Sequence, residues 1–208
     1  MKALADEIRE KLSQDPVLLK LINEILPKVE MTASTQASTD IYFALLDSIV
    51  SQQLSVKAAD TIFKRFLSLF PNQYPSAKLL IEMPTEQLRS VGLSFQKAGY
   101  LKNTAVFFTE NDFDHASLQT FSDEEIIKIL TQIKGVGQWT VEMLLMFVMN
   151  RPDVFPYDDL VVRNNVVRLY ELEGKGVELK KKILTIAEQW RPYRTVACKY
   201  IWRWKDQK

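Results

Sequence analysis

The chain has 208 residues, 47% of them hydrophobic, and a formal net charge of +1 at pH 7. This composition excludes a disordered chain, and the length fits one domain or two small lobes with an ample core. The charge lacks the basic excess of strong electrostatic nucleic-acid binders, so any DNA contact must use a locally basic face or backbone dipoles.

One cysteine, Cys198, excludes an internal disulfide and favours a reducing compartment. With His115 as the only histidine, we expect no zinc or iron–sulfur site built from side chains. The N-terminus has no signal-peptide pattern, and no apolar run is long enough to cross a bilayer, so no membrane partner is expected.

Apolar residues recur at helical spacing along most of the chain, and no hairpin dipeptide separates alternating strands. Asp15-Pro16 separates the first two helices, residues 31–39 form a polar connector, and Asp40 and Ser122 are predicted N-caps. The fold is therefore predicted to be all-α. In chain order, the predicted helices span residues 3–12, 17–25, 41–53, 56–70, 85–91, 94–111, 123–132, 140–150, 160–172, 178–189 and 194–204.

A Gly135-Val136-Gly137 turn joins two helical patterns. The glycines permit positive φ and close approach of another backbone, and Val136 between them is expected to pack as a small plug between the helices. N–H groups at the start of the second helix would point outward and could bind a phosphate. The alternative is an ordinary turn between two helices, for which one glycine normally suffices.

Two adjacent aspartates, Asp158 and Asp159, follow the second helix of this pair. Their carboxylates could place negative charge beside a sugar, whereas in the simpler interpretation both only cap helices. Taken with the glycine turn, they indicate a protein that holds a nucleic-acid backbone and does chemistry next to it.

Residues 130–143 (LTQIKGVGQWTVEM) resemble the helix-hairpin-helix of the base-excision DNA glycosylases of the HhH-GPD superfamily, and residues 153–160 (DVFPYDDL) resemble their loop that ends in an essential aspartate. Residues 49–55, 92–100 and 190–202 are similar to the 3-methyladenine DNA glycosylase II branch. The resemblance implies one unit over residues 1–208, with two helical lobes around a cleft and a hairpin at about residues 125–150. A mostly β N-terminal domain of some members has no counterpart.

The resemblance also implies the chemistry. Family members with a lyase step carry a lysine two residues after the second hairpin glycine, where this chain has Trp139, so a monofunctional enzyme that uses water is expected. Ungapped alignment with Pro156 in register places the essential carboxylate at Asp158, and Arg163 five residues later supports it. Asp159 is the second choice and would otherwise be an N-cap.

Other site residues follow from the same resemblance. The target base must be flipped out of the duplex, and a side chain, the wedge, must fill the gap that it leaves. By resemblance, the helix that supplies the wedge ends at Gln52, Gln53 and Leu54, of which Gln53 aligns best. Aromatic faces suit an electron-poor base. Phe43 is instead expected to pack in the core. The expected base pocket comprises Trp139, Trp202, Tyr42 and Met143, and the expected hairpin contacts to DNA are Gly135, Val136, Gly137 and Thr140.

The predicted function is hydrolysis of the N-glycosidic bond of alkylated bases, such as 3-methyladenine and 7-methylguanine, in double-stranded DNA. Three alternatives remain: a non-catalytic DNA-damage-binding protein, a glycosylase for another modified base, and an unrelated helical domain. No cofactor is expected, although the family permits a structural monovalent cation at the hairpin carbonyls. We expect a monomer in the cytoplasm, with the nucleoid, or in the nucleus of a eukaryote.

Overall fold

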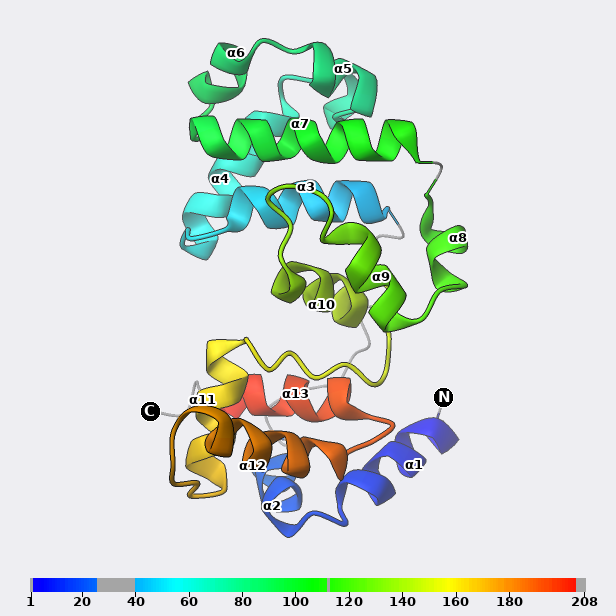
Figure 1. Ribbon diagram of the computed structural model, residues 1–208, viewed down its shortest axis with the longest axis vertical. Helices are drawn as coiled ribbons and strands as arrows, with labels where there is room; N and C mark the ends of the chain where they lie inside the picture. Colours follow the sequence, from blue (N-terminus) through cyan, green and yellow to red (C-terminus); the bar gives the residue numbers. More distant parts are fainter. Residues whose placement is uncertain (1, 26–39, 112, 205–208) are drawn as a thin grey trace. The chain divides into compact units, whose positions relative to one another are not determined.

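A computed structural model describes residues 2–25, 40–111 and 113–204. The connector predicted at residues 31–39 lies outside this part of the chain. The described residues are helical and contain no strand, which confirms the all-α prediction, and no described helix is long and apolar enough to span a membrane. The elements are α1 (Lys2–Leu12), α2 (Pro16–Ile25), α3 (Ile41–Ser51), α4 (Val56–Leu67), the 3-10 turn η2 (Pro71–Gln73), α5 (Ala77–Glu82), α6 (Thr85–Ser90), α7 (Phe95–Glu110), α8 (His115–Gln119), α9 (Asp123–Leu130), α10 (Gln138–Phe147), α11 (Leu160–Leu169), α12 (Gly176–Glu188) and α13 (Arg194–Arg203) (Figure 1).

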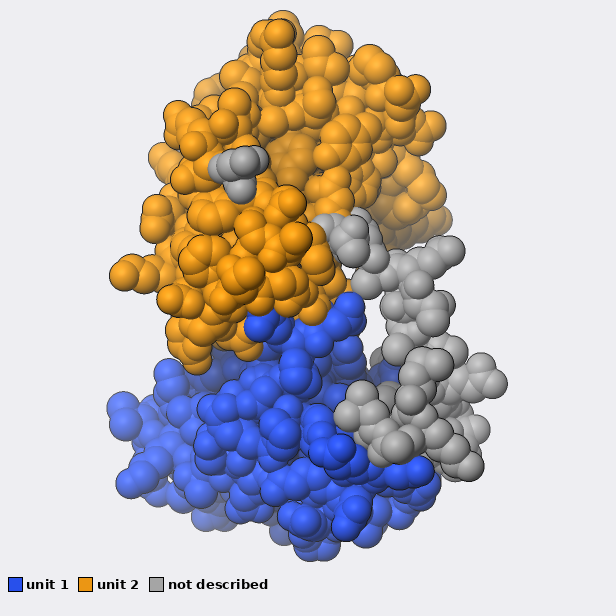
Figure 2. Space-filling view, turned by 90° about the vertical axis from the view of Figure 1, so that its right-hand side faces the viewer, with its two compact units in different colours: residues 1–36, 150–208 blue, residues 37–149 orange. Residues whose placement is uncertain are grey.

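The helices form two compact units, which agrees with the two predicted lobes (Figure 2). Unit 1 combines residues 1–36 with residues 150–208, and unit 2 is the continuous stretch 37–149. Helices from both ends of the sequence therefore share one core, in which α13 packs on both α2 and α11.

Unit 2 is built around α3, whose long inner face is fully apolar. Leu45, Leu46 and Ile49 are completely buried there, and α7 lies alongside with Leu101 also buried (Figure 1). Each such side chain contributes about 1.5–3 kcal/mol to folding. Phe43, which was predicted to lie in the core, packs edge-on against Phe63 with ring centroids 5.4 Å apart but is partly exposed.

Both predicted N-caps are confirmed. Asp40 accepts a hydrogen bond from the backbone N–H of Phe43 at 2.9 Å. Ser122 and Glu125 form a reciprocal capping box at the start of α9. Each cap satisfies N–H groups that the first helical turn would otherwise leave unpaired.

Helix bounds differ from the prediction in several places. α5 and α8 lie in stretches where no helix was predicted, and α8 begins at a capping box between Asp114 and Ser117. α3 ends at Ser51 rather than residue 53, because Gln52 already leaves the helical conformation with a ψ of 130° and Gln53 then has a left-handed φ of 59°. α10 begins at Gln138, directly after the hairpin.

Candidate active site and nucleic-acid interface

The two hairpin glycines have different structural roles. Gly135 has a φ of 107°, and a Cβ there would lie 2.2 Å from Cγ of Tyr100, so only glycine fits. Gly137 has a φ of −95°, and a Cβ there would meet no atom within 4 Å. The fold therefore requires Gly135, while the space above Gly137 is open to another molecule.

The residues around these glycines are mostly buried. Val136 is 5% exposed, as expected for a plug, and its N–H donates to the carbonyl of Ile133 at 2.9 Å. Thr140, which was expected to contact DNA, is 4% exposed, so its side chain lies inside unit 2. Gly137 is the N-cap of α10 and provides no side chain to cap the first turn. The start of α10 can therefore offer backbone N–H groups and the positive end of the helix dipole to an anion.

The three candidate wedge residues point to different surroundings. Gln52 donates from Nε2 to the carbonyl of Gly135 at 3.2 Å, so its side chain is held against the hairpin. Gln53 is exposed and has the left-handed φ described above. Leu54 is 37% exposed. Of the three, Gln53 and Leu54 present their side chains to solvent.

The two aspartates also differ. Asp158 is exposed, whereas Asp159 is 7% exposed and caps α11. Oδ1 of Asp159 accepts hydrogen bonds from the backbone N–H of Val162 at 2.8 Å and from Nε1 of Trp202 at 2.9 Å. The structure thus joins the second-choice carboxylate to a predicted pocket residue within unit 1.

The loop before the aspartates is fastened to the start of α13. Arg194 donates from Nε to Oδ1 of Asp153 at 2.7 Å. Thr195 donates its hydroxyl to the carbonyl of Arg151 at 2.7 Å and accepts from the N–H of Val154 at 3.0 Å. Sequence reasoning gave these residues no role. Arg194 does lie in the C-terminal segment that resembles the family, but its partner Asp153, 41 residues earlier, could not be identified from sequence spacing.

The remaining pocket candidates lie in unit 2. Trp139 is 41% exposed and Met143 is partly exposed; four residues apart, they share one face of α10. Tyr42 is 8% exposed, and its hydroxyl donates to the carbonyl of Pro75 at 2.7 Å. Burial, followed by Tyr74 and Asp40, raises the pKa of Tyr42, so it is a neutral aromatic group. It lines a hollow of about 720 Å³ together with Tyr74 and Phe108.

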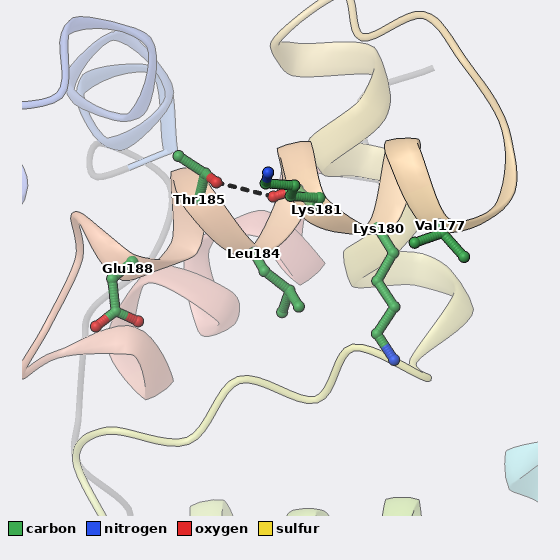
Figure 3. A pocket seen from close by; sticks show the side chains of 6 residues that line it. All are labelled: Val177, Lys180, Lys181, Leu184, Thr185 and Glu188. Atoms are coloured by element: carbon green, nitrogen blue, oxygen red, sulfur yellow. Dashed lines mark hydrogen bonds between the residues drawn. The ribbon is translucent and has the colours of Figure 1, made fainter.

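A cavity of about 500 Å³ lies on α12 in unit 1 (Figure 3). Lys180, Lys181 and Glu188 line it, and none of the predicted site residues does. In the close-up view its side chains come from the one helix and do not converge on a common point (Figure 3). This cavity therefore does not offer a reaction centre. Among the residues that the structure describes, no group of three or more His, Cys, Asp or Glu could hold a metal ion.

Comparison with known proteins gives one consistent result. A model of the "HhH-GPD superfamily base excision DNA repair protein" family matches residues 46–192. DNA-3-methyladenine glycosylase 1 of Schizosaccharomyces pombe is 38% identical over 188 residues, covering 89% of this chain and 79% of that protein. A structure of the 3-methyladenine DNA glycosylase of that yeast with abasic DNA is 35% identical, with a TM-score of 0.81 and 95% of both chains covered. A DNA-3-methyladenine glycosidase of Bacillus halodurans is 31% identical, with a TM-score of 0.82, and covers 97% of this chain and 89% of its own. The family match includes the hairpin, both aspartates and the loop that joins the hairpin helix to the aspartates. The chain belongs to the HhH-GPD superfamily of base excision DNA repair proteins.

Proposed function

We propose that this protein is a monofunctional DNA glycosylase that hydrolyses the N-glycosidic bond of alkylated bases in double-stranded DNA, in base excision repair. The observation that carries the proposal is the pairing of buried Asp159 with Trp202 in a member of this superfamily. Trp139 stands where lyase members have their lysine, and an indole cannot form a Schiff base, so the attacking group is water.

Asp159 is the better-supported catalytic carboxylate, although sequence alignment favours Asp158. When the bond to the base lengthens, positive charge develops on the sugar, and a fixed carboxylate stabilises that charge and orients or deprotonates the water. Such a group must be held in place before the reaction. Two hydrogen bonds fix the Asp159 side chain at the positive end of α11, whereas Asp158 is exposed.

The alkylated base itself supplies much of the driving force. In 3-methyladenine or 7-methylguanine the base already carries positive charge, so it can leave without being protonated and needs no general acid. Electron-rich rings suit such a base through cation–π attraction. Trp139, Trp202 and Met143 are the proposed contacts, and Tyr42 contributes only its ring because its hydroxyl is bonded within unit 2.

DNA binding is assigned to unit 2 through backbone groups. The start of α10, beside the open face of Gly137, is the proposed phosphate site. Gln53 and Leu54 are the proposed wedge residues, because both are exposed at the turn after α3. Few cationic contacts are needed in this arrangement, which is compatible with the net charge of +1.

The proposed enzyme acts as a monomer on damaged duplex DNA, in the compartment that holds the DNA. It needs no redox or nucleotide cofactor. A monovalent cation at the hairpin would have to share carbonyls that already accept side-chain bonds, since Gly135 accepts from Gln52 and Lys134 accepts from Asn103 at 3.3 Å. A carbonyl oxygen has two lone pairs, so both roles are compatible.

The deciding experiment is single-turnover base release with EDTA present. The substrates are duplexes with one 7-methylguanine or 1,N6-ethenoadenine, and genomic DNA treated with a methylating agent. We expect free base and intact abasic strands that break only on alkali treatment. Strand breakage without alkali would contradict the monofunctional assignment. DNA binding with no release from any substrate would instead favour a damage-binding protein.

A further inference from the structure

Lys97 of α7 makes two partly buried contacts that the proposed reaction does not use. Its Nζ donates to the carbonyls of Val50 and Gln52, both at 2.7 Å. These carbonyls lie in the last turn of α3 and just beyond it, where helical carbonyls lack N–H partners within the helix. Burial lowers the pKa of Lys97, so the ammonium is partly desolvated, and the two short bonds offset that cost.

α7 also holds the hairpin. Tyr100 lies three residues from both Lys97 and Asn103 and is therefore next to each of them on the helix surface. The Tyr100 ring fills the space where a Cβ of residue 135 would lie, and Asn103 donates from Nδ2 to the carbonyl of Lys134 at 3.3 Å. The wedge turn and the hairpin are thus fixed to one rigid helix, and the bond from Gln52 to Gly135 joins them directly.

Gln53 shows why this fastening matters. A left-handed φ costs a residue with a side chain about 1–2 kcal/mol, so the turn persists only where its neighbours hold it. Here Gln52 is held twice, at its carbonyl by Lys97 and at its side chain by the hairpin. Gln52, Gln53, Leu54 and Lys97 also line a cavity of about 220 Å³, so part of the space next to the turn is not filled by other side chains.

We propose that Lys97 is a positioning residue for the wedge. It holds the exposed turn at Gln53 and Leu54 in the conformation in which their side chains can fill the gap left in the duplex by the flipped base. The inference rests on the proposed function. Because its Nζ already donates to two carbonyls at the turn, the expected effect of Lys97 is on base flipping rather than on phosphate binding or on cleavage of the bond.

The test compares three full-length variants on two substrates. Lys97→Met removes the two bonds, Lys97→Arg keeps donors for both carbonyls, and Lys102→Met removes a charge from the same helix at about 140° around its axis. One substrate is a duplex in which the alkylated base that the wild type releases fastest is paired. The other carries the same base in a single-nucleotide bulge, where the base is already unpaired and needs no wedge.

For Lys97→Met we expect a single-turnover rate at least about tenfold lower on the paired substrate, and a rate within about twofold of wild type on the bulge, because small misplacements of a positioned group carry costs of this size. Lys97→Arg should recover most of the rate, and Lys102→Met should match wild type on both. Equal rates for Lys97→Met and Lys102→Met on the paired duplex would overturn the inference, as would an equal loss on both substrates.

Two outcomes need separate treatment. If Lys97→Met does not fold, Gln52→Met removes only the bond to Gly135 and should show the same loss confined to the paired substrate; a wild-type rate there would overturn the inference. If wild-type protein releases no base from either substrate, it is the proposed function that fails, which is distinguishable because the wild type is measured first.

Discussion

The indole N–H of Trp202 donates to Oδ1 of Asp159 across 2.9 Å, although 43 residues separate them in the sequence. The same oxygen accepts the N–H of Val162 at the first turn of α11. One donor comes from α13 and the other from the helix that Asp159 caps, so both helices fix the carboxylate. This is the geometry expected of a charged group that must be oriented before a substrate arrives.

Asp159→Asn should abolish most base release while leaving the fold intact. Asparagine is an equally good N-cap and can accept the indole N–H, but it carries no negative charge for the developing positive charge on the sugar. We expect a loss of at least about 10²-fold in the single-turnover rate, the scale typical of a lost electrostatic contact in a transition state. Unchanged thermal unfolding and abasic-DNA binding provide the control.

Asp158→Asn is the matched comparison, because its parent carboxylate is exposed and lies one residue away. Its rate should stay within about fivefold of wild type, in the range of a modest surface electrostatic effect. The reverse pattern, with Asp158→Asn inactive and Asp159→Asn active, would restore the assignment that sequence alignment favours.

Trp202→Phe isolates the hydrogen bond from the ring. Phenylalanine keeps an aromatic face for the base but has no N–H for Asp159. Hydrogen bonds to charged groups contribute about 1.5–3 kcal/mol, which corresponds to a rate reduced by about 10- to 100-fold if the carboxylate loses its orientation. Single-turnover rates at saturating enzyme measure this directly. A wild-type rate would mean that Trp202 serves only as a pocket wall.

The sequence predicted the long helices well because each repeats an apolar face over several turns. α7, with 16 residues, was recovered to within one residue at each end. α5 and α8 have six and five residues, too few turns for a periodic signal to develop. α8 instead depends on the Asp114–Ser117 capping box, a local hydrogen-bond pattern that many loops also carry.

The sequence alone does not distinguish between neighbouring candidate site residues of the same type. Adjacent aspartates look alike in sequence, yet Asp159 is buried and bonded to Trp202 of α13 while Asp158 stays exposed. The two hairpin glycines differ because Tyr100, 35 residues earlier, lies against one of them. Lys97 belonged to a recognised segment, but its partners at Val50 and Gln52 depend on how α7 lies along α3. Distant contacts of this kind leave no local pattern.

Substitution of the two hairpin glycines should separate folding from DNA binding. Gly135→Ala forces a Cβ into the Tyr100 ring at a positive φ, so we expect a destabilisation of about 2 kcal/mol or more, measured by chemical denaturation. Gly137→Ala meets no atom of the protein, so it should lose much less stability than Gly135→Ala, within about 1 kcal/mol for a poorer N-cap.

The effect of Gly137→Ala should appear instead in binding. A methyl group at the start of α10 would keep a phosphate away from the N–H groups, so we expect weaker affinity for an abasic duplex, by about tenfold for one lost charge-assisted contact. Fluorescence anisotropy at fixed salt measures this affinity. Unchanged affinity in Gly137→Ala would remove the hairpin from the proposed DNA interface.

Replacement of Asp15 should change the stability of the protein without changing catalysis. It is 7% exposed, and its Oδ1 accepts the N–H groups of Val17 and Leu18 at 3.0 and 3.1 Å, while Oδ2 accepts from Nε1 of Trp190 and from the hydroxyl of Tyr170. Asp15→Ala would leave the buried N–H of Trp190 and the partly buried hydroxyl of Tyr170 without this acceptor and would remove the cap of α2, so we expect a loss of about 3 kcal/mol or more in the free energy of unfolding. Asp15→Asn keeps one acceptor oxygen, which can still cap α2 but leaves an NH2 group toward Trp190 and Tyr170, and it should lose less than Asp15→Ala. Urea unfolding followed by tryptophan fluorescence reports on this network because Trp190 belongs to it. Base release well below the unfolding transition should stay close to wild type for both variants, and an Asp15→Ala protein as stable as wild type would contradict the role given to this carboxylate.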